Sequence, residues 1–307
     1  MAKLKLKTRQ IEFEMTNRCN ASCVFCPRHD PRQKGLIELK TIKAGVNLAK
    51  AAGIKGFKIS GFGEPTLHPK LVEYLQYIRK EVPDAFILLI TNGQLFTPAL
   101  FDALAAIPVD RINISFNGFD KKSYEAQMKQ LKFDTVMENL RYIAANNPAG
   151  IDIQFVPILS KLFGPKDVEK MKDLLKGIGF SGDNFKYHHV ITWRSEKLDK
   201  TGLVDAEFIK NVQDMEIKDK TKIVCLAHLS NLYVSWQGTI HICCQDIYGE
   251  AVIGKIFDLK TAADLKKLED ENIKLRANYS FEVCQKCDRP LTLPHHDIDG
   301  TIFTSFS

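Results

Sequence analysis

The sequence has little of what marks a membrane or exported protein. Its longest purely apolar run, AFILLI at 85–90, is far shorter than the ~18–20 residues that a helix needs to cross a bilayer. The opening residues, MAKLKLKTRQ, lack the apolar stretch of a secretory signal. Internal repeats and low-complexity tracts are also missing. These absences predict a cytoplasmic protein with no membrane partner.

Charge gives little indication of a nucleic-acid partner. The net charge is +6, but the lysines are spread over helix-like segments such as KDVEKMKDLLK, which is typical of a solvated helix face. With 45% hydrophobic and 26% charged residues, the composition is that of an ordinary globular protein. The 307 residues are enough for one large α/β domain with a small appendage.

The eight cysteines form two groups, and residues 27–224 contain none. Cytosolic thiols stay reduced, so clustered cysteines in a chain without an export signal indicate metal ligands rather than disulfides. The gap between the groups predicts two separate sites. The cysteines are Cys19, Cys23, Cys26, Cys225, Cys243, Cys244, Cys284 and Cys287.

Short β-rich runs alternate with helical patterns over the first two thirds of the chain, which predicts an α/β fold built on a parallel sheet. In such sheets, active sites gather at the carboxyl ends of the strands, and the first cysteine group follows the first strand directly. The six predicted strands are 10–15, 56–61, 86–91, 111–116, 151–158 and 185–191, with helices near 39–52, 69–82, 97–106, up to 146, and 165–178.

The architecture changes towards the C-terminus. The segment NLYVSWQGTIHICC at 231–244 predicts two short strands joined by a turn at Gln-Gly, a β-hairpin rather than another βα unit. The predicted division is residues 1–195 for the first domain, 196–221 for a linker helix, and 222–307 for a small domain made of the hairpin and a helix.

Three thiolates raise the question of what they bind. A structural zinc ion normally takes four ligands, whereas an iron–sulfur cluster with one open iron needs only three. The spacing Cys19-x3-Cys23-x2-Cys26 resembles the signature of the radical S-adenosylmethionine (SAM) superfamily. SGFGEP at 60–65 is similar to that family's Gly-Gly-Glu-Pro segment, with Phe62 in place of one glycine. TNG at 91–93 and ISFNG at 114–118 occupy further strand ends.

The resemblance implies a partial (β/α)6 TIM-type barrel in which the three thiolates hold a [4Fe–4S] cluster. SAM binds the open iron there, and an injected electron cleaves it to a 5′-deoxyadenosyl radical. The glycines allow close backbone approach to the SAM amino group, and Glu64 orients that segment or neutralises the ammonium. Phe25 packs on adenine, while Ser115 and Asn117 contact SAM or only cap a strand end. The implied SAM-binding positions are Phe25, Gly61, Gly63, Glu64, Ser115 and Asn117.

The second cysteine group resembles the Twitch domain, the shorter relative of the SPASM domain. Its pattern implies one auxiliary [4Fe–4S] cluster held by Cys225, Cys243, Cys284 and Cys287. Hairpin cysteines followed by Cys-x2-Cys also fit a zinc ribbon, so a zinc site is the alternative. Cys244 is left over, and because neighbouring strand residues point to opposite faces, we expect it to pack rather than ligate.

The catalytic acid or base is not identified by the sequence. Side chains at or beyond the last strands could face a cavity between the domains, and PHHDIDG at 294–300 is either a metal motif or a polar tail. The cavity candidates are Gln154, His188, His189, Trp193, Arg194 and Asp246.

Three functions remain open at this point. The first is an oxidoreductase that acts on a small polar metabolite, such as an aminocyclitol or sugar alcohol, with a reductase or flavodoxin-type electron donor. The second is a maturase that forms a crosslink, epimer or thioether on a precursor peptide. Because the motif begins at Cys19, we expect no N-terminal domain that captures a leader peptide, and this expectation slightly favours the small molecule. The third is a non-catalytic iron–sulfur or zinc scaffold, against which the GFGEP segment argues.

Overall fold

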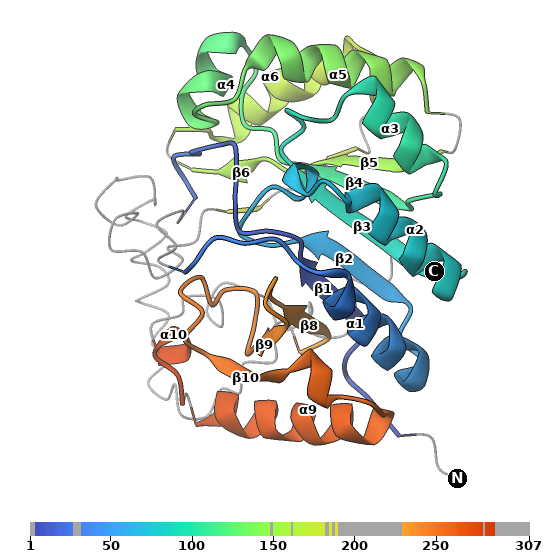
Figure 1. The fold of residues 1–307 in the computed structure, drawn as a ribbon. Coiled ribbons are helices and arrows are strands. Elements are labelled where there is room, and N and C mark those ends of the chain that lie inside the picture. The colour runs from blue at the N-terminus through green and yellow to red at the C-terminus, as the bar shows by residue number, and fades with distance from the viewer. Residues whose placement is uncertain are drawn as a thin grey trace.

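A curved eight-stranded sheet forms the centre of the molecule (Figure 1). The computed structural model describes residues 4–26, 32–147, 150–160, 162–181, 184–185, 188–189, 229–278 and 280–285. The predicted linker helix at 196–221 lies outside the described residues, as do Trp193, Arg194 and the PHHDIDG segment. Within the described residues, no helix has the length and apolar character that a membrane span requires.

The βα alternation predicted from the sequence is confirmed. The parallel strands are β1 (Gln10–Glu14), β2 (Gly56–Ser60), β3 (Phe86–Thr91), β4 (Arg111–Ile114) and β5 (Asp152–Phe155). The helices are α1 (Leu39–Ala52), α2 (Leu71–Glu81), α3 (Pro98–Ala105), α4 (Lys121–Gln127), α5 (Phe133–Ala145) and α6 (Pro165–Lys176), with a short 3₁₀ turn, η1 (Pro65–Leu67). This arrangement is the predicted partial TIM-type barrel.

Local chemistry explains several helix boundaries. Thr97 caps α3 by accepting a hydrogen bond from the Leu100 N–H, and Pro98 occupies the first helical position, where no N–H is needed. Asp120 and Ser123 form a reciprocal capping box at the start of α4. Gly53 ends α1 in the left-handed conformation, with φ of +70°.

The strand predicted at 151–158 is divided, and of the run predicted at 185–191 only residues 185, 188 and 189 are described. The run predicted at 151–158 divides into β5 and β6 (Ile158–Leu159), because Pro157 between them has no N–H for a ladder hydrogen bond. β6 pairs in parallel with β7 (His188–His189) in a separate two-stranded sheet. Among the named strands the eight-stranded sheet ends at β5, and beyond it a parallel bridge joins Phe155 to Phe185 in the run predicted at 185–191.

The C-terminal hairpin is present, but it belongs to the same sheet as the barrel strands. β8 (Asn231–Val234) pairs in parallel with β1, from Gln10↔Asn231 to Phe13↔Val234. β9 (Thr239–His241) and β10 (Val252–Lys255) follow in antiparallel order. Buried β1 needs a partner for its free edge, and β8 provides it. The 3₁₀ turn η3 (Ile256–Asp258) then leads to α9 (Ala262–Ala277) and α10 (Glu282–Gln285).

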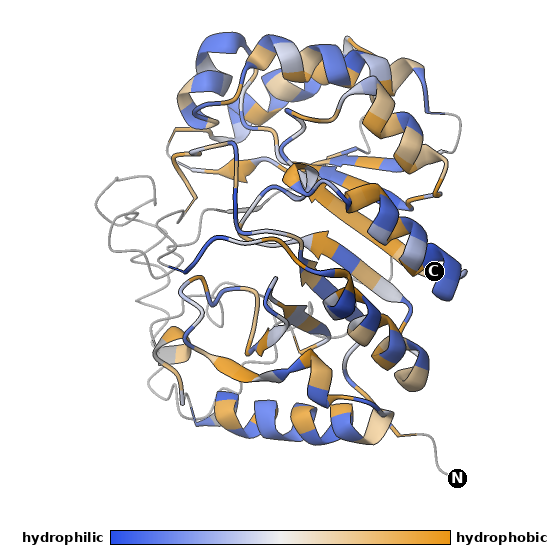
Figure 2. Ribbon diagram, viewed as in Figure 1, coloured by the Kyte–Doolittle hydropathy of each residue, from blue (hydrophilic) through white to orange (hydrophobic). Residues whose placement is uncertain are grey.

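The sheet has an apolar outer face, and its inner face is polar on β1, β2, β4 and β5 but apolar on β3, where Leu88 and Ile90 lie in register with Lys58 and Asn113. On β1, Phe13 packs under α1, where a Cβ atom on Gly45 would lie only 2.4 Å from the Phe13 ring. Side chains alternate along a strand, so Glu12 and Glu14 point to the opposite, inner face, where both are buried. Figure 2 shows hydrophobic and hydrophilic positions alternating around the helices, whereas β3 is hydrophobic along its length.

Candidate active site

The three N-terminal cysteines lie in the loop that follows β1, at the carboxyl edge of the sheet. All three side chains are half-buried. The backbone N–H of Ala21 points to Cys19 Sγ at 3.4 Å, and the Cys26 N–H donates to the Cys23 carbonyl at 3.1 Å. A backbone donor directed at sulfur stabilises a thiolate. The loop therefore presents cysteine side chains in a setting that suits metal ligation.

The end of α4 holds this loop in place. The Ser22 N–H donates to the Lys129 carbonyl at 2.8 Å, and the Val24 N–H donates to the Gln127 carbonyl at 2.9 Å. Cys23 Sγ lies 3.6 Å from Met128 Sδ. The loop thus takes its shape from a segment that follows it by about a hundred positions, which the sequence analysis did not reveal.

The GFGEP segment lies directly against the backbone that precedes Cys19. The Glu64 N–H donates to the Arg18 carbonyl at 2.8 Å. Gly61 has a φ of +121°, a conformation that side chains rarely adopt, and its backbone lies against Glu14. Gly61 and Gly63, the two glycines singled out from the sequence, therefore allow the backbones at the ends of β1 and β2 to lie in close contact.

Glu64 is a buried carboxylate surrounded by donors. Its Oε1 accepts hydrogen bonds from the Thr66 N–H at 3.1 Å, the Thr66 hydroxyl at 2.7 Å and the Thr91 hydroxyl at 2.7 Å, and its Oε2 accepts from the Asn92 N–H at 2.7 Å. Burial raises the pKa of Glu64, and these hydrogen bonds oppose the rise. Glu64 therefore joins the second strand end to the TNG segment after β3.

A second contact of Asn92 completes the link to the cysteine loop. Its side-chain Nδ2 donates to Asn20 Oδ1 at 2.7 Å. Asn20 follows Cys19 directly, so one chain of hydrogen bonds runs from Glu64 through Asn92 to the first cysteine. The motifs that the sequence places after the first three strands are in contact through this chain.

The remaining SAM-binding candidates have different surroundings. Phe25 is buried with the main hydrophobic core, and Ser115 is half-buried beyond β4 with its N–H donating to the Thr91 carbonyl. Asn117 is fully buried; its Nδ2 donates to the Ile158 carbonyl at 2.9 Å and its Oδ1 accepts from the Ile158 N–H at 3.2 Å. Asn117 therefore fixes the segment after β5 as well as ending β4.

Polar side chains lie on the inner face of β1, β2, β4 and β5 below these loops, while β3 contributes Leu88 and Ile90 to the same face. Glu12 contacts Lys58 at 3.1 Å on the adjacent strand. Asn113 and Gln154 are register partners on β4 and β5, and their buried oxygens, Oδ1 and Oε1, have no hydrogen-bond partner among the described residues. Unpartnered buried acceptors are uncommon and point to a ligand or water that supplies a donor. The alternation in RINISFN was the sequence signal for Asn113, and it was overlooked.

A buried ion pair joins the barrel to the C-terminal strands. Arg32 donates to Glu14 through its two terminal guanidinium nitrogens, at 2.9 and 3.3 Å, and stacks over the Phe62 ring at 5.2 Å. Glu14 also accepts from the Trp236 N–H at 3.4 Å, and Arg32 packs against Gly249 in the loop after β9. Phe62, where the family segment has glycine, therefore fills the space between the barrel and the hairpin.

Two of the C-terminal cysteines lie in one small hydrophobic cluster. Cys243 and Cys284 both pack against the cluster formed by Ile242, Ala251 and Val283. Cys225 and Cys287 lie outside the described residues. In the part of the chain that the structure describes, no three His, Cys, Asp or Glu side chains meet around a single ion; in an iron–sulfur cluster each thiolate binds a different iron, so cluster ligands need not converge so closely.

Asp246, a candidate for the cavity, is a structural group instead. It is fully buried and contacts His241 Nδ1 at 2.7 Å. Burial acts to raise the pKa of Asp246, but the hydrogen bonds from His241 and from the Ala251 N–H hold it below the usual value. For His188 and His189 only the backbone is described, as β7.

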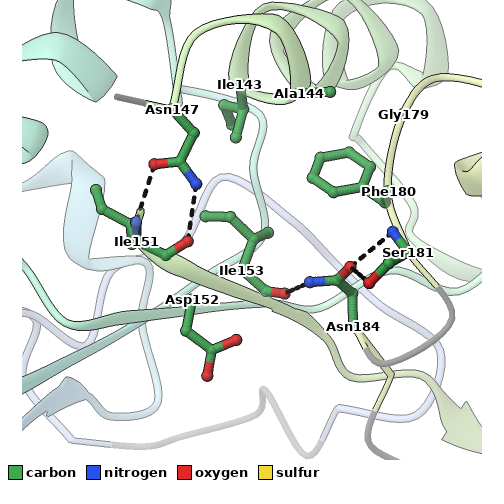
Figure 3. A pocket seen from close by; sticks show the side chains of 10 residues that line it. All are labelled: Ile143, Ala144, Asn147, Ile151, Asp152, Ile153, Gly179, Phe180, Ser181 and Asn184. Carbon is green, nitrogen blue, oxygen red and sulfur yellow. Dashed lines mark hydrogen bonds between the residues drawn. The ribbon is translucent and has the colours of Figure 1, made fainter. Parts of the chain in front are cut away.

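A cavity of about 240 Å³ lies at the opposite edge of the sheet, where β5 begins (Figure 3). Its two asparagines are already bonded: Asn147 to both backbone groups of Ile151, and Asn184 to Ser181 and the Ile153 carbonyl. None of the sequence-predicted site residues lines it. This cavity is therefore separate from the candidate active site.

Comparison with protein families gives a match to the radical SAM superfamily over residues 13–175, more than half of the chain. Among curated proteins, a probable GTP 3′,8-cyclase from Pyrococcus abyssi is 34% identical over 38% of this chain and 37% of its own length. A second, from Thermoplasma volcanium, is 29% identical over 54% of this chain and 49% of its own. The chain thus matches half or less of the length of these relatives.

Several solved structures share the fold over nearly the whole chain. BtrN in complex with AdoMet and 2-DOIA is 14% identical, with a TM-score of 0.56 and 94% of both chains covered. AnSMEcpe with bound AdoMet is 15% identical, with a TM-score of 0.63 and coverage of 91% and 88%. SuiB from Streptococcus suis, bound to its precursor peptide SuiA, is 14% identical, with a TM-score of 0.65 and coverage of 92% and 70%.

Proposed function

Because this chain belongs to the radical SAM superfamily, we propose that Cys19, Cys23 and Cys26 hold a [4Fe–4S] cluster, with SAM in the loops after β1 to β4. The donor set fits: three half-buried cysteines lie in one loop, beside backbone that only glycine allows so close. When bound, cluster and SAM supply a 5′-deoxyadenosyl radical that removes a hydrogen atom from substrate. Gly61, Gly63 and Glu64 shape the SAM-binding edge, and Phe25, Ser115 and Asn117 complete its walls.

The substrate is a small polar metabolite, of the kind represented by aminocyclitols and sugar alcohols. The observation that carries this proposal is the group of polar side chains on the inner face of β1, β2, β4 and β5. The Glu12–Lys58 contact and the partnerless oxygens of Asn113 and Gln154 offer charges and acceptors to hydroxyl and amino groups. An apolar substrate would leave the oxygens of Asn113 and Gln154 buried without partners, at a cost of about 1–3 kcal/mol each.

The C-terminal cysteines are proposed to hold an auxiliary [4Fe–4S] cluster. Cys243 and Cys284 already share one hydrophobic cluster, and Cys225 and Cys287 would complete four thiolates. A cluster with four protein ligands supplies an electron acceptor, so that substrate loses two electrons overall while SAM is consumed. The electron that starts each turnover would come from a reductase or flavodoxin-type donor. We propose the division 1–195, 196–221 and 222–307 for the barrel, linker and auxiliary-cluster parts.

Peptide maturation is the second candidate. The likeness to SuiB, which is described with its precursor peptide, covers 92% of this chain. At 14% identity that likeness concerns the fold, and the polar side chains of the inner face are what favour the metabolite. A peptide substrate would place its backbone and side chains, rather than several hydroxyl groups, against Asn113 and Gln154.

The double variant Cys284→Ala/Cys287→Ala tests the proposal. Anaerobically reconstituted protein is incubated with SAM, dithionite and a panel of aminocyclitols and sugar alcohols carrying deuterium at the reacting carbon. The parent protein should transfer deuterium to 5′-deoxyadenosine and form a product lacking two hydrogen atoms. The double variant should still cleave SAM but form no oxidised product, whereas the matched Cys244→Ala variant should retain both.

Two results would contradict the proposal. Oxidised product at the parental level from a soluble double variant would exclude the auxiliary cluster as electron acceptor. Deuterium transfer from a synthetic peptide, with none from the whole panel, would favour the maturase.

A further inference from the structure

One face of α4 is turned towards the cysteine loop. Tyr124, Gln127 and Met128 are spaced i, i+3 and i+4 and therefore share that face, and all three are buried. Met128 Sδ lies against Cys23 Sγ, and the Gln127 carbonyl accepts from the Val24 N–H. The same face thus makes both contacts with the loop that carries the three cysteines.

Tyr124 is held rigidly on this face. Its ring packs against Phe116, with centroids 4.8 Å apart, and against Phe133 at 5.6 Å. A Cβ atom on Gly118 would lie 2.5 Å from Tyr124 Cα, so Gly118 allows α4 to approach the end of β4. The ring is fully buried and its neighbours leave it no room to turn outwards.

The Tyr124 hydroxyl has no hydrogen-bond partner among the described residues, although it is buried. A buried hydroxyl without an acceptor costs free energy, and native structures seldom contain one. Burial raises the pKa of Tyr124 strongly, and the negative charges of Cys23 and Glu64 raise it further. The hydroxyl therefore stays a protonated donor, on the helix face whose Met128 lies against Cys23.

We propose that the Tyr124 hydroxyl donates its hydrogen bond to a sulfur atom of the cluster held by Cys19, Cys23 and Cys26. The proposal rests on the proposed function in one respect, namely that these cysteines bind the cluster. A hydrogen bond to cluster sulfur stabilises the additional negative charge of the reduced state, so it raises the reduction potential. Tyr124 then makes the first cluster easier to reduce.

The test uses the Cys284→Ala/Cys287→Ala background, so that only the first site carries a cluster. Reduction potentials are measured by electron paramagnetic resonance during a redox titration, without substrate. Tyr124→Phe removes only the hydroxyl, and the potential should shift to a more negative value. Tyr233→Phe is the matched control, because Tyr233 is equally buried but lies on β8 beside Glu14; its potential should not shift.

A second measurement separates this role from simple packing. In the cluster-free protein the hydroxyl has no acceptor, so Tyr124→Phe should raise the midpoint of urea unfolding, and reconstitution should remove that advantage. A potential equal to that of the parent would overturn the proposal. Iron content distinguishes this outcome from failure of the proposed function. If Cys19, Cys23 and Cys26 did not bind the cluster, replacing all three would leave the iron content equal to that of the parent.

Discussion

A Cβ atom on Gly63 would lie 2.2 Å from the carbonyl oxygen of Thr16. The backbone of the GFGEP segment therefore lies directly on the backbone at the end of β1, and no side chain fits between them. Because Cys19 follows three residues after Thr16, this contact sets how the SAM-binding edge meets the cysteine loop.

Gly63→Ala should therefore disturb both stability and SAM binding. Overpacking against fixed backbone costs typically about 1–3 kcal/mol, and the free energy of unfolding in urea should fall by that amount or more. Affinity for SAM, measured by calorimetry on reconstituted protein, should fall as well. Gly164→Ala is the control, since nothing lies within 4 Å of a Cβ there; equal effects of both variants would contradict the argument.

Glu64 should make stability depend on pH with a defined sign. Burial raises its folded pKa above the unfolded value, so its contribution to stability is present below the unfolded pKa and is lost as pH rises through the folded pKa. Glu64→Gln should remove this loss, so the difference in unfolding free energy between variant and parent should move in favour of the variant as pH rises. Glu73→Gln, on exposed α2 surface, should show no such trend.

Iron content tests the assignment of the cysteines. Two four-iron clusters predict about eight irons per chain after anaerobic reconstitution. Replacing Cys19, Cys23 and Cys26 together should halve the iron and abolish formation of 5′-deoxyadenosine. About four irons with about one zinc in the parent protein would instead identify the C-terminal site as a zinc ribbon.

Gln154 should contribute to substrate affinity more than to chemistry. If its Oε1 accepts a hydrogen bond from bound substrate, Gln154→Met should raise KM by about tenfold, which corresponds to about 1.4 kcal/mol, with kcat little changed. Steady-state kinetics with the active polyol or aminocyclitol measure both constants. Gln76→Met, on exposed α2 surface, is the matched control. An unchanged KM would show that Gln154 does not bind the substrate.

Local sequence patterns were sufficient for the order of the elements. The strand predicted at 86–91 and the helix predicted at 39–52 have those bounds in the structure, because hydrophobic periodicity and capping residues act over a few neighbouring positions. The Cys19-x3-Cys23-x2-Cys26 spacing likewise identified the family, which the match over residues 13–175 confirms. Features that depend on neighbouring residues can therefore be predicted from the sequence.

The tertiary structure decided which distant residues meet. Nothing local to Asn231 predicts that β8 pairs with β1, and nothing near Tyr124 predicts that its buried hydroxyl lacks a partner among the described residues. Glu64 accepts hydrogen bonds from Thr66, Thr91 and Asn92 only because the ends of these strands lie together in the fold. These contacts depend on the order of the strands in the sheet and on the packing of each helix, and both are properties of the whole chain. The sequence alone therefore determined the motifs, and the tertiary structure determined which residues contact them.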